Sequence, residues 1–487
     1  MAPGAGPATA ARETGVDLPL LTHRGTLRTR ARETVHGVDG RPLATLSLAP
    51  ELLVSQALAA QRRTDPLPAP ERERRLREAA DRFLGDVLGG LSFAEHCALV
   101  HAVSGHNAPL TAALSRGVAE AIARAPSRAD RARPLGSVRS WREAEREPGS
   151  GSGVWTRRGE TLAAVLSGNT PTIQNGWLQA LALGYRVAVR PSRREPFTAH
   201  RVIAALRAAG FRDTDALYLP SAHAGVPVLL RRADLGLAYG GADVEAAYGA
   251  SPAVKVAGPG RSKTLVTGGR LSPQTLEAVA DSVAALSGTA CVNTTTVLVE
   301  GDHVRFARDL ARVLRERAAG RQTTERYLGP RVAEETARSL IASVRRGASG
   351  ARAEIPLEEV ATPHPQGGVV LGPAVFAASG PGGGGVFGAE LPFPCVWVAP
   401  WTPADGTGPL RDSLVVNVVG GEGELIDALL REPSITNVYR DTPTVHSDGD
   451  LPHEGYLGDF LMRNKAVVSG PRTGRPTPRA PSVQGLL

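Results

Sequence analysis

The sequence has few cysteines and aromatic residues, and it has no long apolar run. The three cysteines, Cys97, Cys291 and Cys395, lie far apart, which argues against a disulfide framework or a cysteine-rich zinc site. We therefore expect no metal, and a reducing cytoplasm is the expected compartment. No run approaches the length of a membrane span, and the first 16 residues lack the apolar segment of a signal peptide. We expect no membrane partner.

The charge balance is basic, but the excess is scattered. The chain has 56 lysines and arginines against 48 aspartates and glutamates, a formal net charge of +8. Nucleic-acid-binding domains usually gather such charge on one face, and no basic stripe with interleaved aromatic residues is present. We therefore expect no nucleic acid partner. A basic pocket for an anionic cofactor explains part of the excess equally well.

Strands and helices alternate over most of the chain. Short apolar runs predict strands at 162–166, 185–189, 216–219, 235–239, 254–257 and 264–267 in a first series, and at 367–371, 395–399, 414–419 and 435–439 in a second. Helical patterns of 10 to 15 residues separate many of these runs, which predicts mostly parallel, doubly wound α/β sheets. Such sheets bind nucleotides at the carboxyl ends of their strands. The glycine fingerprint of the dinucleotide-binding Rossmann fold, Gly-x-Gly-x-x-Gly, is absent.

A chain of this length is expected to hold two or three domains. Composition and pattern divide it into a disordered N-terminus, a first α/β domain in two pieces, an excursion rich in Arg, Ser, Pro and Gly, a second α/β domain, and a C-terminal segment with a tail. The predicted bounds, in that order, are 1–16, 17–134 with 157–270, 135–156, 271–450 and 451–487.

The stretch 289–294 around Cys291 is the candidate nucleophile site. A helical pattern that begins after Ser272 leads to it and is predicted to end at Gly288, and a β-branched run follows from Thr294. A thiol between a helix end and a strand start is rigidly placed yet reachable, which suits a nucleophile. A buried structural cysteine is the alternative.

Four short stretches, in this order along the chain, resemble the aldehyde dehydrogenase superfamily. They are Ser167-Gly168-Asn169-Thr170-Pro171, Val189-Arg190-Pro191-Ser192, Gly288-Thr289-Ala290-Cys291 and Ala389-Glu390-Leu391-Pro392-Phe393. The resemblance covers residues 70–465. It implies the α/β fold of that family, in which the first domain binds the cofactor, the second carries the cysteine, and 135–156 with 451–487 form an oligomerisation region. It also implies a homodimer or homotetramer.

The resemblance also implies roles for individual residues. Cys291 would attack a carbonyl carbon, and the Asn169 amide with the backbone N–H of Cys291 would hold the oxyanion. The alternative for Asn169 is a plain helix cap. Arg190, in the place of the family's lysine, and Ser192 would contact a cofactor ribose, and Glu390 would contact the nicotinamide ribose.

The cofactor loops add two further predictions. Arg193 follows Arg190 and Ser192, and guanidinium groups fork onto phosphate, so the loop favours a 2′-phosphate and hence NADP(H). A solvated loop is the alternative. Gly240 stands in the turn near the cofactor pyrophosphate without the family's serine, and Gly258 lies in the next loop at the same site.

One departure from the family pattern bears on the reaction. Ala257 stands where hydrolytic members carry the glutamate that activates water, and loss of a general base costs about 10²–10⁴-fold in rate. The run Gly258-Pro259-Gly260 resembles the CoA-acylating branch and the fatty acyl-CoA reductases of the bioluminescence type. The sequence therefore predicts NADPH-dependent reduction of an acyl thioester, on CoA or on a carrier protein, to an aldehyde through a thioacyl group on Cys291.

The alternative is an NAD(P)-dependent aldehyde dehydrogenase that oxidises an aldehyde to the acid or to acyl-CoA, with a base supplied from elsewhere in the chain. His223, His446 and His453 are candidate proton carriers, and the sequence favours none of them because a lone histidine is more often structural. A non-catalytic protein on the same fold is disfavoured, since Cys291, Asn169 and Glu390 are all present.

Overall fold

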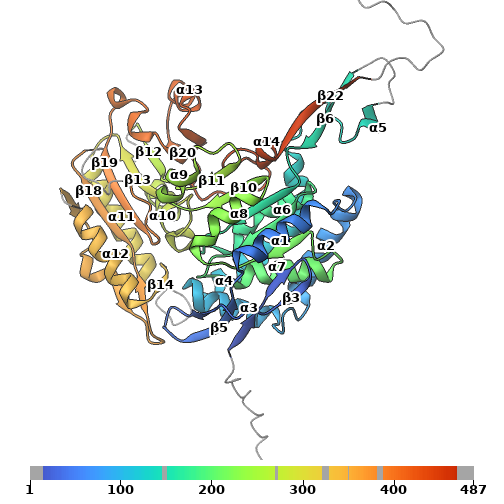
Figure 1. Cartoon of the computed structure of the whole chain (residues 1–487). Helices are drawn as coiled ribbons and strands as arrows, with labels where there is room; N and C mark the ends of the chain where they lie inside the picture. Colours follow the sequence, from blue (N-terminus) through green and yellow to red (C-terminus); the bar gives the residue numbers. More distant parts are fainter. Residues whose placement is uncertain are drawn as a thin grey trace, which may run out of the picture.

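The computed structural model of the protein describes residues 15–144, 151–268, 272–320, 328–348, 350–380 and 388–468. Two large mixed sheets, each covered by helices, form two lobes that lie side by side (Figure 1). This arrangement confirms the predicted α/β fold with two doubly wound units. Within the described residues, the structure has no helix that is both long and apolar enough to cross a membrane. The predicted disordered N-terminus, 1–16, lies mostly outside the described residues, although Val16 already belongs to the first strand.

The first sheet has the strand order β11-β10-β7-β8-β9-β2-β3. In that order the strands are Val254–Ala257, Leu235–Tyr239, Thr161–Val165, Arg186–Arg190, Ala216–Tyr218, Leu20–Thr22 and Gly25–Leu27. The strands from β11 to β9 run parallel, and β2 and β3 form an antiparallel edge. Every residue of β7, β8 and β9 is buried. Such continuous burial is typical of a parallel sheet covered on both faces.

Helices on both faces of this sheet complete the first lobe. One face packs against α1 (Glu51–Arg62) and α8 (Val226–Arg232). The other packs against α2 (Ala69–Gly85), α4 (Ala108–Asp130), α6 (Asn175–Ala182) and α7 (Phe197–Ala208). Smaller elements are α3 (Phe93–Ser104), α5 (Trp141–Ala144), α9 (Ala242–Tyr248) and a three-stranded sheet of β1 (Val16–Leu18), β5 (Pro42–Ser47) and β4 (Arg32–His36).

The second sheet has the order β15-β18-β19-β13-β12-β20-β21. In that order the strands are Ala351–Ala353, Ala374–Ala378, Cys395–Pro400, Thr294–Val299, Ser262–Val266, Ser413–Val419 and Ile435–Arg440. One face packs against α10 (Pro273–Ala284), α11 (His303–Ala319) and α12 (Glu334–Gly347), and the other against α13 (Gly423–Arg431). A small sheet of β14 (Arg331–Val332), β17 (Val369–Leu371) and β16 (Ala361–Pro363) flanks this lobe.

A two-stranded ribbon projects from the first lobe. Strand β6 (Gly151–Arg157) pairs antiparallel with β22 (Met462–Val468), which follows the short helix α14 (Leu457–Leu461). In Figure 1 the ribbon extends away from the body with α5 beside it. It joins the predicted excursion to the C-terminal segment, two pieces that are far apart in the sequence.

Two local predictions at the junction of the lobes are wrong. The apolar run 264–267 does not close the first series, because β12 pairs with β13 and β20 of the second sheet. The helix before Cys291 ends at Ala284, not at Gly288, and the residues between form a short turn. Its start is as predicted, since the Ser272 hydroxyl accepts from the Thr275 N–H at 3.1 Å.

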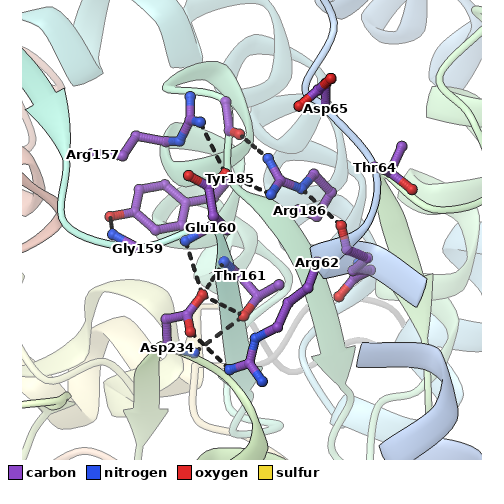
Figure 2. A network of polar contacts seen from close by, with 12 residues as sticks. Arg62, Thr64, Asp65, Arg157, Gly159, Glu160, Thr161, Tyr185, Arg186 and Asp234 are labelled. Atoms are coloured by element: carbon purple, nitrogen blue, oxygen red, sulfur yellow. Dashed lines mark hydrogen bonds and ion pairs between the residues drawn. The ribbon is translucent and has the colours of Figure 1, made fainter. Parts of the chain in front are cut away.

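Polar groups fix the amino ends of the first sheet (Figure 2). The Asp234 carboxylate, just before β10, accepts from the backbone N–H groups of Glu160 and Thr161 at 2.9 Å each and pairs with Arg62 of α1 at 2.7 Å. Buried Arg186 of β8 pairs with Glu160 at 2.6 Å. Because parallel strands share one direction, this network lies opposite the carboxyl ends, where sheets of this class bind ligands.

A buried carboxyl group at the start of α7 gives the fold a pH dependence. Glu195 is 5% exposed, and its Oε1 accepts from the Thr198 N–H at 2.9 Å. No ion pair to Glu195 forms among the described residues. Burial raises the pKa of this carboxyl to about 7, and the hydrogen bond offsets only part of that effect.

We predict that Glu195→Gln makes stability less dependent on pH. The folded carboxyl keeps its proton up to about pH 7, whereas the unfolded one, with a pKa of 4.5, has lost it by then. Stability therefore falls as pH rises through this window, by about 3 kcal/mol in total. Thermal unfolding at pH 5 and pH 8 measures the loss, with exposed Glu358→Gln as the control. An unchanged pH dependence in Glu195→Gln would contradict the assignment.

Candidate functional site

The turn that carries Cys291 is held in a strained and well-anchored conformation. Leu286 and Ser287 both have positive φ, 54° and 59°, a region that non-glycine residues rarely adopt. Asn293 anchors the turn from the other side: its Oδ1 accepts from the Ala290 N–H at 2.8 Å, and its Nδ2 donates to the carbonyls of Ser282 and Ala285. Cys291 is therefore fixed at the boundary of the two lobes, half-buried between α10 and β13.

The loop after β11 of the first sheet lies directly against this turn. A Cβ atom at Gly260 would lie 1.9 Å from the Cys291 carbonyl oxygen, so only glycine fits there. The Ser262 hydroxyl donates to the same carbonyl at 2.9 Å. Cys291, the candidate nucleophile, thus lies at the carboxyl edge of the first sheet.

Two carboxylates are bound to the backbone of this loop. Glu390 Oε2 accepts from the Gly260 N–H at 2.6 Å, and Glu454 Oε1 accepts from the Gly258 N–H at 2.8 Å. Glu390 and Gly258 are predicted site residues, whereas no sequence pattern singles out Glu454. Burial raises the pKa of the Cys291 thiol to about 12, and the charges of Glu454 and Glu390 act in the same direction. Cys291 is therefore a thiol at neutral pH, and a base must remove its proton before it can attack.

A histidine lies beside the thiol. The His453 Nε2 is 3.5 Å from the Cys291 Sγ. Its segment is tied to both lobes, because Asn437 of β21 donates to the His453 carbonyl at 2.6 Å and Lys255 of β11 donates to the Glu454 carbonyl at 2.7 Å. His453 is separated from Cys291 by 162 residues, so no spacing pattern could have singled it out among the histidines.

Asn169 lies next to the nucleophile turn. Its Nδ2 donates to the Thr289 carbonyl at 3.2 Å, and its Oδ1 accepts from the Ser167 hydroxyl at 2.6 Å. The helix-cap alternative is wrong, because the short helix Pro171–Gln174 is capped by the side chain of Thr170. The oxyanion role of Asn169 stays a prediction; its amide contacts Thr289, which lies two residues before Cys291 in the chain.

The residues predicted to hold a dinucleotide lie at the carboxyl edge of the first sheet. Arg190, at the end of β8, is 7% exposed; its Nη2 donates to the Ser221 carbonyl, while its buried Nε has no partner among the described residues. Such an orphaned donor fits a site for a polar ligand. The Ser192 hydroxyl lies close to Gly168, where a Cβ would be 2.6 Å from it. The Arg190 guanidinium and the Ser192 hydroxyl are donors that fit the hydroxyl groups of a ribose.

The structure places the two glycines of the predicted cofactor loops together, but it gives Arg193 a protein partner. Gly240 and Gly258 meet at the same edge, since a Cβ at Gly258 would lie 2.7 Å from the Gly240 carbonyl oxygen. Arg193, by contrast, pairs with Glu33 of β4 at 3.0 Å. A 2′-phosphate would have to displace that carboxylate, so preference for NADP(H) over NAD(H) stays a prediction.

The other two cysteines lie in regular elements of the two lobes. Cys395 is buried in β19, where burial raises the pKa of its thiol, and Cys97 lies on α3. Both are free thiols with a packing role. Over the part of the chain that the structure describes, no group of three His, Cys, Asp or Glu side chains is placed to hold a metal ion.

Comparisons with known proteins agree with this geometry. The model of the aldehyde dehydrogenase family matches residues 30–381. Among solved structures, the chain is similar to an NAD-dependent aldehyde dehydrogenase from Sinorhizobium meliloti, with 17% identity over 98% of this chain and 99% of that one and a TM-score of 0.77. It is also similar to the indole-3-acetaldehyde dehydrogenase AldA of P. syringae in complex with NAD+ and IAA, with 17% identity over 94% and 97% and a TM-score of 0.78.

A third similar structure is the 1-pyrroline-5-carboxylate dehydrogenase of Thermus thermophilus, with 15% identity over 96% of this chain and 99% of that one and a TM-score of 0.76. At these identities the likeness shows the fold alone. A comparison with curated proteins finds no match.

We predict that Gly260→Ala abolishes most activity while the protein still folds. The added methyl group overlaps the Cys291 carbonyl, so the loop must move away and take the Glu390 contact with it. Gly423→Ala is the matched control, because no atom lies within 4 Å of its Cβ position. Steady-state rates and thermal unfolding of both variants are compared. Full activity in Gly260→Ala would contradict the close approach of the loop.

Proposed function

Since this chain belongs to the aldehyde dehydrogenase family, we propose that it oxidises an aldehyde through a thioester on Cys291, with a nicotinamide dinucleotide as hydride acceptor. The observation that supports this reading best is the His453 imidazole, 3.5 Å from the Cys291 Sγ. It supplies from elsewhere in the chain the base that Ala257 cannot provide.

The first step is proton transfer followed by attack. His453 takes the proton of the Cys291 thiol, whose raised pKa would otherwise keep it protonated. The thiolate forms a bond to the aldehyde carbon, and the carbonyl oxygen becomes an oxyanion. The Asn169 amide and the Cys291 backbone N–H would hold that charge.

The second step converts this adduct to a thioester on Cys291. Hydride transfer from the adduct carbon is the chemistry that the dinucleotide supplies when bound; Arg190, Ser192 and Glu390 would hold its riboses. His453 is exposed, so it can release the proton it has taken to solvent. It can then accept a proton from water as the water attacks the thioester, which gives the acid and restores the thiol.

Glu454 supports the same assignment. Its carboxylate is bound to the loop residue next to Ala257, and burial raises its pKa. A carboxylate is thus restored near the place where hydrolytic members of the family carry their glutamate, although it comes from the C-terminal segment. We propose that Glu454 orients His453 and the attacking water.

A second candidate, reduction of an acyl thioester, is favoured by Ala257 itself. Without a glutamate at this position, the thioester on Cys291 would exchange with a thiol faster than with water. In that direction an acyl group on CoA or on a carrier protein passes to Cys291, and the departing thiolate takes a proton from His453. A hydride is the chemistry that NADPH would supply when bound; the bond from the reduced carbon to the Cys291 sulfur then breaks, which releases the aldehyde and the Cys291 thiolate. The same residues serve both directions.

We also propose that the chain forms a homodimer or a homotetramer through the β6–β22 ribbon. The ribbon is a two-stranded sheet in which the other edge of β6 bonds only to Val138, while the outer edge of β22 pairs with no strand among the described residues; Val468 on β22 is 74% exposed. Exposed strand edges of this kind pair readily with another strand.

Two incubations separate the candidate reactions. We expect acid from an aldehyde panel with NAD+ or NADP+ and no CoA, and an acyl adduct on Cys291 visible by mass spectrometry. Cys291→Ala should lose both. If acid does not form, but acyl-CoA with NADPH gives aldehyde, the reductase candidate is correct. An adduct that survives Cys291→Ala would exclude this cysteine as the nucleophile.

We predict that His453→Gln lowers kcat by about 10²–10⁴-fold, since it removes a positioned general base. His446→Gln is the matched control: it lies on the same segment, but its ring packs edge-on against Tyr439 at 6.2 Å. The pH–rate profile tells a base from a packing role, because loss of a base also removes the acid limb of the profile. Comparable rates in the two variants would sink the role of His453.

A further inference from the structure

A cavity of about 640 Å³ lies where the β6–β22 ribbon joins the first lobe. Its walls come from the start of α2, the end of α4, the ribbon, and the segments that precede β7, β8 and β10. It therefore opens at the amino edge of the first sheet, whereas Cys291 and the cofactor loops lie at the carboxyl edge. Its volume is that of a small-molecule site.

Cationic side chains from distant parts of the sequence converge on this cavity. They are Arg72, Arg139, Arg157, Arg158, Arg463 and Lys465. Four acidic residues also line it, and three of them already have cationic partners. Asp130 pairs with Arg133 and Arg139. Glu160 pairs with Arg157 and Arg186, and Asp234 with Arg62 (Figure 2). Only Glu73 then remains to balance Arg72, Arg158, Arg463 and Lys465, which form no ion pair among the described residues.

Arg72 shows the imbalance most clearly. It is buried, 9% exposed, and its guanidinium donates only to the backbone carbonyls of Ala182 and Leu67. The Arg157 guanidinium crowds the same spot: a Cβ at Gly184 would lie 2.9 Å from Arg157 Nη1 and 3.3 Å from Arg72 Nη1. Burial lowers the pKa of Arg72 to about 10, and the charge of Arg157 adds to this effect.

We propose that this cavity binds a small multivalent anion of the phosphate or pyrophosphate class. Guanidinium groups recognise phosphate oxygens in pairs, and Arg72 and Arg157 bring two of them to one point. Arg157 also pairs with Glu160, but Arg186 shares that carboxylate. Arg463 and Lys465 are two positions apart on β22, so their side chains lie on the same face of the ribbon and add two exposed cations. The anion joins the ribbon to α2 and to the amino edge of the sheet, and its binding stabilises the fold by mass action.

The test is calorimetric titration of the full chain with pyrophosphate at constant ionic strength, together with thermal unfolding. Wild-type protein is compared with Arg463→Gln/Lys465→Gln and with Arg308→Gln/Arg338→Gln. The second pair removes the same charge from two exposed arginines on α11 and α12 of the other lobe. We expect the ribbon variant to bind at least about tenfold more weakly and to lose the rise in Tm, while the control keeps both.

Two results would overturn the proposal. Equal affinity in the wild type and the ribbon variant would place pyrophosphate elsewhere, for example at the dinucleotide loops. No binding to the wild type, combined with a changed sedimentation coefficient of the ribbon variant, would make the cavity a contact with a second copy of the chain. Neither outcome depends on the reaction proposed for Cys291.

Discussion

The structure depends on the contact between the backbone of Gly260 and the Cys291 carbonyl. It brings a loop of the first sheet within van der Waals distance of a turn in the second unit, and it leaves no room for a side chain. This contact places Cys291 beside the carboxyl edge of the first sheet, which is where a dinucleotide would bind. The strained turn at Leu286 and Ser287 and the anchoring by Asn293 serve the same end, since each fixes the turn that must meet the loop. Strain of this kind persists only where surrounding contacts over-determine it.

The electrostatics of the site follow from how this loop is held. Its N–H groups are satisfied by Glu390 and Glu454, one from the second lobe and one from the C-terminal segment. Two carboxylates beside a thiol disfavour the thiolate, so the arrangement that closes the site also keeps Cys291 protonated. A resting thiol is protected from oxidation, because the thiolate is the reactive form. The proposed attack by Cys291 therefore needs a proton acceptor, and the His453 imidazole lies beside the sulfur.

Much of this could be predicted from the sequence, and the reason is local. Buried parallel strands are continuous apolar runs, so β7, β8, β19 and β20 can be predicted without a structure. Cys291 can be selected as a candidate nucleophile because it lies between a predicted helix and a predicted strand. Glu454 could not be found in this way, and His453 could be named only as one of three candidate histidines, because both reach the site through folding of a segment that has no regular pattern. The pairing of β12 with the second sheet was missed for a related reason: an apolar run predicts a strand but not which neighbours it joins. The ion pair of Arg193 with Glu33 joins residues 160 positions apart, so the composition of the loop around Arg193 could not predict it.

The two edges of the first sheet carry different kinds of polar chemistry, and the direction of its strands explains the difference. At the carboxyl edge, loops after β8, β10 and β11 present backbone groups, glycines and an orphaned guanidinium nitrogen to a ligand. At the amino edge, segments before β7, β8 and β10 are bound to one another through Asp234, Glu160 and Arg186, which leaves little freedom to move. A rigid amino edge holds the strands in register while the loops at the other edge adapt to ligands. The ribbon is joined to both edges: β6 leads through Arg157 and Arg158 to the amino edge, whereas β22 follows α14 and the segment that carries His453 and Glu454 beside Cys291.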